Sequence, residues 1–312
     1  MGGPAAWLLA AANPPEQKTV TSMKLDDLTS LGRIPFDPGY LTNWAIALLT
    51  VGVTAVSSVV QLLTGQGWFP SLLWGVSAGL SVFLAWALAR ELDPDHDLSA
   101  FVAVALMLGG LFVFGLPELL PALWMIVTLR LVNRVVGPPA KISDSLLELG
   151  LGGWLAWQGQ WAFGLITGLA FLLVGLLPAP LRHQLAFAAL VLILTAVGVL
   201  AGGTPAGGDV SALSLPMTAT MVLTSLLFLV VILDSRHAQA VTDTRQEPLV
   251  PIRVQAGQLL ALLTGILAAW WQRTGGVILL LPLWAGMAGT GLYRILVLLL
   301  QVRPTDAAFK GK

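Results

Sequence analysis

The stretch Arg90-Glu91-Leu92-Asp93-Pro94-Asp95-His96-Asp97 separates two long apolar segments, residues 69–89 and 98–116. It places four carboxylates and one histidine within seven positions, in a chain otherwise dominated by hydrocarbon side chains. Because such charges are costly inside a bilayer, this cluster marks the point where one membrane crossing ends and the next begins.

The composition is that of an integral membrane protein. The 312 residues are 56% hydrophobic and 10% charged, and mean hydropathy is +0.84, whereas soluble domains carry about 25% charged residues. Sixteen basic and sixteen acidic residues give zero net charge, so there is no basic field to bind nucleic acid. The absence of cysteine excludes disulfides, thiolate nucleophiles and iron–sulfur clusters.

We expect an all-α fold, a polytopic transmembrane helix bundle of about ten spans. One span needs about 20 residues at 1.5 Å rise per residue. The fifth expected span, residues 145–160, is short for a membrane crossing and rich in glycine. The expected spans are 43–63, 69–89, 98–116, 119–136, 145–160, 161–179, 183–202, 215–233, 256–272 and 276–300.

Three regions follow from these spans. Residues 1–42 form an N-terminal cytoplasmic or interfacial arm, residues 43–302 the transmembrane helical domain, and residues 303–312 a cytoplasmic C-terminal tail. Within the arm, the apolar residues of the 23–31 segment fit a short helix on the membrane surface or a solvated lead into the first span.

The distribution of basic residues predicts that both termini are cytoplasmic, because cytoplasmic loops carry an excess of Lys and Arg. Only Arg273 falls outside, and Arg130 and Arg294 lie near the cytoplasmic ends of the fourth and tenth spans. Omitting the fifth span would move four arginines to the exterior, so the pattern favours ten spans. We expect a bacterial inner (plasma) membrane. The residues placed inside are Lys18, Lys24, Arg33, Arg90, Arg134, Lys141, Arg182, Arg236, Arg245, Arg253, Arg303, Lys310 and Lys312.

Pairs of small residues four positions apart predict close helix packing, since each pair lies on one helix face. Pro282 predicts a kink in the last span. The pairs are Gly75 with Gly79, Gly164 with Gly168, and Ala285 with Gly289.

The acidic residues suggest a Mg²⁺ site, because Mg²⁺ prefers oxygen ligands and often bridges to substrate phosphates. The proposed ligands are Asp93, Asp95 and Asp97, joined by two residues of the longest inner loop, Asp234 and Asp243. His96 would then shuttle protons. The alternative is that Asp93 caps the following helix and that Asp95 and Asp97 favour the positive end of its dipole.

Other candidate catalytic residues lie at the same expected face. Arg130, with Asn133 beside it, could grip a phosphate at the end of the fourth span. Asp144 remains a candidate because the spacing of Ser145 and Glu148 predicts a capping box that does not use it.

Two functions compete, and the crowding of polar groups at one interface, away from the middle of the spans, favours the membrane enzyme over the carrier. An acidic cluster after the second span and another acidic inner loop resemble the layout of the UbiA-type prenyltransferases. The chain lacks their Asn-Asp-x-x-Asp-x-x-x-Asp pattern and has more spans than is usual for them. This resemblance implies a membrane enzyme that acts with Mg²⁺ on a lipid or isoprenoid phosphate, with membrane lipids as partners.

The size and ten-span plan also resemble drug/metabolite transporters, which implies a small-molecule carrier in which the acidic stretch is only a helix cap. The expected spans have no Asp, Glu, Lys or His at their middle, which argues against a coupled transporter. Membership of a larger complex is a third possibility.

Overall fold

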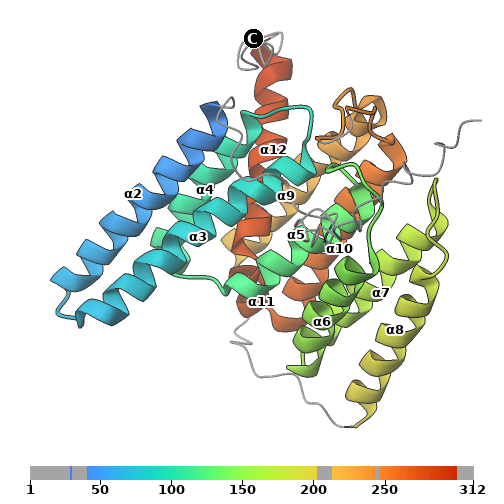
Figure 1. Cartoon of the computed structure of the whole chain (residues 1–312). Helices are drawn as coiled ribbons and strands as arrows, with labels where there is room; N and C mark the ends of the chain where they lie inside the picture. Colours follow the sequence, from blue (N-terminus) through green and yellow to red (C-terminus); the bar gives the residue numbers. More distant parts are fainter. Residues whose placement is uncertain (1–28, 30–40, 202–212, 244–245, 301–312) are drawn as a thin grey trace, which may run out of the picture.

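The computed structural model describes residues 29, 41–201, 213–243 and 246–300, which form helices and no β-strand (Figure 1). The expected surface helix of the arm and the C-terminal tail fall outside these residues. The helices are α2 (Leu41–Leu63), α3 (Trp68–Leu92), α4 (Ser99–Phe114), α5 (Leu119–Asn133), α6 (Ile142–Trp157), α7 (Trp161–Leu176), α8 (Gln184–Leu200), α9 (Leu215–Asp234), η1 (Ser235–His237), α10 (Pro251–Gln272), α11 (Thr274–Leu279) and α12 (Leu281–Leu300).

Each of the first nine expected spans corresponds to one helix. Five described helices are long and apolar enough to cross a membrane: α2, α3, α9 with the turn that follows it, α10 and α12. Four more, α4, α5, α7 and α8, are apolar but shorter. The all-helical fold is therefore confirmed for the described residues, and the length and composition of these helices support an integral membrane protein.

The last expected span is divided. Helix α11 ends at Leu279, and α12 starts at Leu281, so Pro282 lies in the first turn of a new helix. Proline is tolerated there because the first amide groups of a helix have no partner within it. The interruption predicted from Pro282 is present, as a break between two helices and not as a kink within one.

Helix α2 lies at the edge of the bundle, beside α3 (Figure 1). Only 6% of its most apolar window is buried, against 61% for α3 and for α10, so α3 and α10 are central helices. The outer side chains of α2 are large and apolar, for example Leu48 and Val51. Such a surface suits contact with lipid and not with water.

Small residues allow the closest helix contacts, as their spacing predicted. A Cβ atom on Gly75 would lie 2.5 Å from the carbonyl oxygen of Thr54 on α2. One on Gly289 would lie 2.4 Å from the backbone nitrogen of Ala103, where α12 crosses α4. Glycine is therefore required at both crossings.

The connections 93–98, 134–141, 177–183 and 235–250 meet at one end of the bundle, which we call the ionic end. Contacts that join them include the bond from the Asp243 backbone N–H to the Val135 carbonyl. Arg253, in the first turn of α10, reaches the carbonyls of Val132 and Pro178. The chain therefore returns to one end after each pair of neighbouring helices, as alternating spans require.

We expect the Gly289→Ala substitution to lower the free energy of unfolding by roughly 1–3 kcal/mol, because the backbone of α4 must move to make room. Thermal unfolding in detergent measures this loss. Gly109→Ala is the matched control, since a Cβ there meets nothing within 4 Å. Equal losses in the two variants would contradict the packing described here.

Candidate functional site

Glu91, near the end of α3, is buried and accepts hydrogen bonds from the end of α5. Arg130 Nε donates to Glu91 Oε1 at 2.9 Å, and Asn133 Nδ2 lies 3.4 Å from Oε2 and 3.2 Å from the Glu91 carbonyl oxygen. Glu91 is 1% exposed, and such partners offset the cost of burying its side chain. The two side chains expected to grip a phosphate thus hold Glu91 in this structure.

A second chain of polar contacts joins three parts of the bundle. His96 Nδ1 lies 3.0 Å from Asp93 Oδ1, and His96 Nε2 lies 2.8 Å from Arg294 Nη1 on α12. Arg294 also forms an ion pair with Asp234 at the end of α9. These contacts connect the α3–α4 turn, α12 and α9.

The partners of His96 determine its hydrogen-bonding state. Arginine can only donate, so Nε2 of His96 accepts from Arg294, and the proton on Nδ1 is donated to Asp93. The free lone pair that a general base requires is therefore occupied. His96 could shuttle protons only after Arg294 moves away.

The other proposed metal ligands have different partners. Asp97 forms an ion pair with Arg90. Asp95 Oδ1 accepts from the backbone N–H groups of Gln239 and Ala240, at 3.1 and 2.7 Å. In the part of the chain that the structure describes, no three His, Asp or Glu side chains gather closely enough to hold a metal ion. The magnesium site thus stays a prediction.

The alternative reading of Asp93 as a helix cap is wrong. Helix α4 starts only at Ser99, after a turn in which the His96 backbone N–H donates to the Asp93 carbonyl. Asp93 instead follows the last residue of α3, and its carboxylate contacts His96. Asp93 therefore lies at the C-terminal cap position of α3, with its backbone N–H donating to the Ala89 carbonyl, and does not cap the start of α4.

The expected capping box of Ser145 and Glu148 is also wrong, because α6 begins at Ile142, four residues earlier than that pattern implies. Asp144 Oδ2 accepts from the Lys141 backbone N–H at 2.8 Å, and Thr29 Oγ1 donates to its other oxygen at 2.5 Å. Asp144 thus secures the start of α6, some distance in sequence from the other candidates.

Sequence reasoning missed the burial and the contacts of three polar residues. Arg253 is 1% exposed and donates to the carbonyls of Pro178, Val132 and Ala179. Gln258 Nε2 donates to the Leu92 carbonyl and to Ser235 Oγ, both at 2.7 Å. The third, Glu148, lies within α6. Arg253 was counted only as a topology signal, and nothing in the local pattern indicated its partners.

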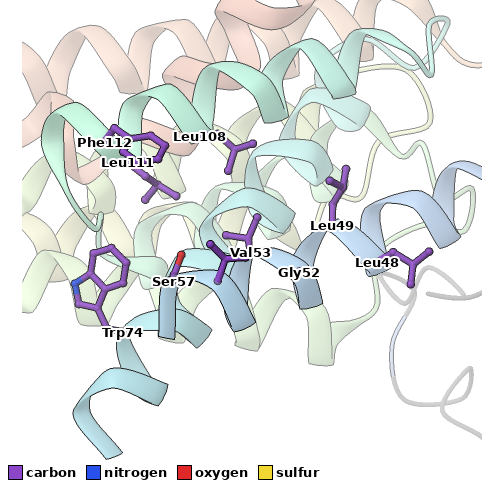
Figure 2. Close-up of a pocket in the computed structure, with 10 residues that line it drawn as sticks. Leu48, Leu49, Gly52, Val53, Ser57, Trp74, Leu108, Leu111 and Phe112 are labelled. Atoms are coloured by element: carbon purple, nitrogen blue, oxygen red, sulfur yellow. The ribbon is translucent and has the colours of Figure 1, made fainter. Parts of the chain in front are cut away.

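An apolar groove of about 450 Å³ runs between α2, α3 and α4. Figure 2 shows Val53 of α2 and Leu108 and Leu111 of α4 along it, with Trp74 of α3 at one end. Ser57 is the one lining side chain with a polar oxygen among the described residues. The groove therefore suits a hydrocarbon chain.

We expect Arg130→Met to destabilise the protein by about 3–5 kcal/mol, since it leaves Glu91 buried without its cation. Adding Glu91→Gln to that variant should restore much of the loss. A double-mutant cycle of thermal unfolding in detergent measures the coupling. Additive losses would show that the two side chains do not stabilise each other.

No protein-family model matches the chain, and no curated protein or solved structure is significantly similar to it.

Proposed function

We propose that the chain is a ten-span carrier of small solutes whose cytoplasmic end is closed, in this conformation, by the ionic contacts at the ionic end. Both termini lie in the cytoplasm in this proposal, in a bacterial inner membrane. The distribution of Lys and Arg supports that orientation.

The observation that carries the proposal is the bridging position of Arg294. Its guanidinium contacts His96 in the α3–α4 turn and Asp234 at the end of α9. One side chain of α12 thus connects two other parts of the bundle. A contact of this kind favours the closed arrangement and can be replaced by water when the helices separate.

The energetic balance suits a reversible closure. The Arg294 side chain is mostly buried and that of Asp234 is half-exposed, so these charges lose only part of their hydration, and pairing offsets much of that cost. When this end opens, the ion pair of Arg294 and Asp234 separates, and water hydrates both side chains. The difference between the two states is therefore small, as an alternating carrier requires.

Accessibility of a thiol tests the closure. The chain has no cysteine, so Ser99→Cys introduces a single thiol at a buried position where the serine hydroxyl donates to the His96 carbonyl. We expect a water-soluble maleimide to label Ser99→Cys slowly. Labelling should become roughly tenfold faster when Arg294→Met is added, which corresponds to about 1.4 kcal/mol.

Arg236→Met is the matched control, because it removes an exposed arginine from the same end of the bundle. It should leave the labelling rate of Ser99→Cys unchanged. An equal rate with and without Arg294 would show that its contacts do not close this end.

Uptake tests carrier activity itself. We expect proteoliposomes that contain the purified chain to accumulate at least one class among radiolabelled amino acids, nucleosides and tetraphenylphosphonium, with saturation. Liposomes without protein should not. If none of the three classes of solute accumulates, the proposal that the chain carries common metabolites or organic cations is contradicted.

The apolar groove favours a second candidate, the membrane enzyme that acts with Mg²⁺ on a lipid or isoprenoid phosphate. The groove would hold the hydrocarbon chain of the substrate, and Asp93, Asp95, Asp97, Asp234 and Asp243 would have to leave their present partners to bind the metal. Replacing Asp93, Asp95 and Asp97 by Asn should then abolish Mg²⁺-dependent turnover of such a lipid, whereas unchanged turnover would exclude these ligands.

A further inference from the structure

Glu148 is a buried carboxyl group that the proposed closure of the ionic end does not use. It lies inside α6 and is fully buried. Its Oε1 atom is 2.8 Å from Thr128 Oγ1 on α5 and 3.3 Å from Thr167 Oγ1 on α7. Its Oε2 atom has no hydrogen-bond partner among the described residues. Three helices therefore meet around one acid.

We infer that Glu148 is a proton-binding site, which in this conformation holds its proton on Oε1 as a neutral carboxylic acid. The ligand is the proton, shielded from water by α5, α6 and α7. This inference concerns the protein's own hydrogen bonds and does not require the carrier function.

The available hydrogen atoms support the neutral acid. Thr128 has one hydroxyl hydrogen but two oxygens within reach, the Trp124 carbonyl at 3.0 Å and Glu148 Oε1 at 2.8 Å. If Thr128 donates to the Trp124 carbonyl, the hydrogen between Thr128 and Glu148 must come from the acid. If Glu148 were a carboxylate, the Thr128 hydroxyl would donate its hydrogen to Glu148. The contact between Thr128 Oγ1 and the Trp124 carbonyl would then contain no hydrogen.

Thr167 completes the arrangement without another proton. Its oxygen accepts from Trp124 Nε1–H at 3.0 Å, so its own hydrogen is free to be donated to Glu148 Oε1. Gly152 explains why Thr167 comes so close, since a Cβ there would lie 2.0 Å from the Thr167 hydroxyl. When the acid is neutral, each of the hydrogens on Thr128, Thr167, Trp124 Nε1 and Glu148 Oε1 has an acceptor, and Oε2 of Glu148 lacks a partner among the described residues.

The surrounding helices supply no cation to stabilise a charged Glu148. Helices α7 and α8 carry no charged or titratable residue, and His183 directly precedes α8 and contacts Gln184. On α5 the only charged residue is Arg130, which pairs with Glu91. It lies two positions from Thr128 and hence points about 200° away around the helix.

The other titratable residue of α6 is Asp144, in its first turn. Asp144 is held by Thr29 and by the Lys141 backbone, so it is engaged at the helix start. A buried carboxylate without a nearby cation is strongly disfavoured relative to the neutral acid. Glu148 should thus release its proton only when the three helices separate and water enters.

Infrared spectroscopy of the purified full chain in detergent tests the site directly. The wild-type minus Glu148→Gln difference spectrum at neutral pH should contain the C=O stretching band of a carboxylic acid, and no carboxylate band. Glu118→Gln is the matched control, because exposed Glu118 should contribute a carboxylate band instead. A carboxylate band lost with Glu148 would overturn the inference.

A second measurement guards against a variant that fails to fold. Gln resembles the neutral acid, since its amide can donate to Thr128, so Glu148→Gln should keep the wild-type unfolding temperature at neutral pH. Thr128→Val removes the hydroxyl group that accepts a hydrogen bond from the protonated acid. This substitution should therefore shift the C=O stretching band of the acid. An acid band in the same place in Thr128→Val would contradict the assigned hydrogen bond.

A coupling role for this proton rests on the proposed carrier function. With a solute that the wild type transports, an inward proton gradient should increase accumulation severalfold, whereas Glu148→Gln should exchange that solute without responding to the gradient. A gradient response in Glu148→Gln would exclude coupling through this residue. Absence of any transport would instead contradict the carrier proposal, and the infrared result would still decide the proton site.

Discussion

The whole arrangement depends on one constraint: a charged side chain that is buried away from water is costly unless groups from other parts of the chain pair with it. Glu91 finds Arg130 and Asn133, His96 finds Arg294, and Arg253 finds three backbone carbonyls. These contacts concentrate at one end of the bundle. These contacts therefore determine which helix ends lie next to one another.

Apolar packing alone would not select that order, because lipid tails are as apolar as the side chains of the helices. Close approach at glycine and directed hydrogen bonds supply the selectivity. Gly289 allows α12 to lie against the backbone of α4, and the same helix carries Arg294 to His96. Packing in the middle of the helices and ionic contacts at their end thus support the same arrangement.

The sequence allowed the helices and the position of the acidic cluster to be predicted, because apolar run length and charge spacing are local properties. The partners could not be predicted, since neither spacing nor composition says which helices are neighbours. Asp93 and Glu148 illustrate the limit: each matched a helix-start pattern, yet each contacts side chains that the pattern does not contain. Glu148 was expected in the first turn of a helix, whereas the structure places it further into α6 and fully buried.

The central claim, that the ionic end lies at the cytoplasmic boundary, is tested most directly by labelling one thiol from each side of the membrane. Gln239 is exposed, and its backbone N–H donates to Asp95 in the acidic stretch. Gln239→Cys should react with an impermeant maleimide in inside-out vesicles and not in right-side-out vesicles. Labelling in right-side-out vesicles would place the ionic end outside and contradict the proposed topology.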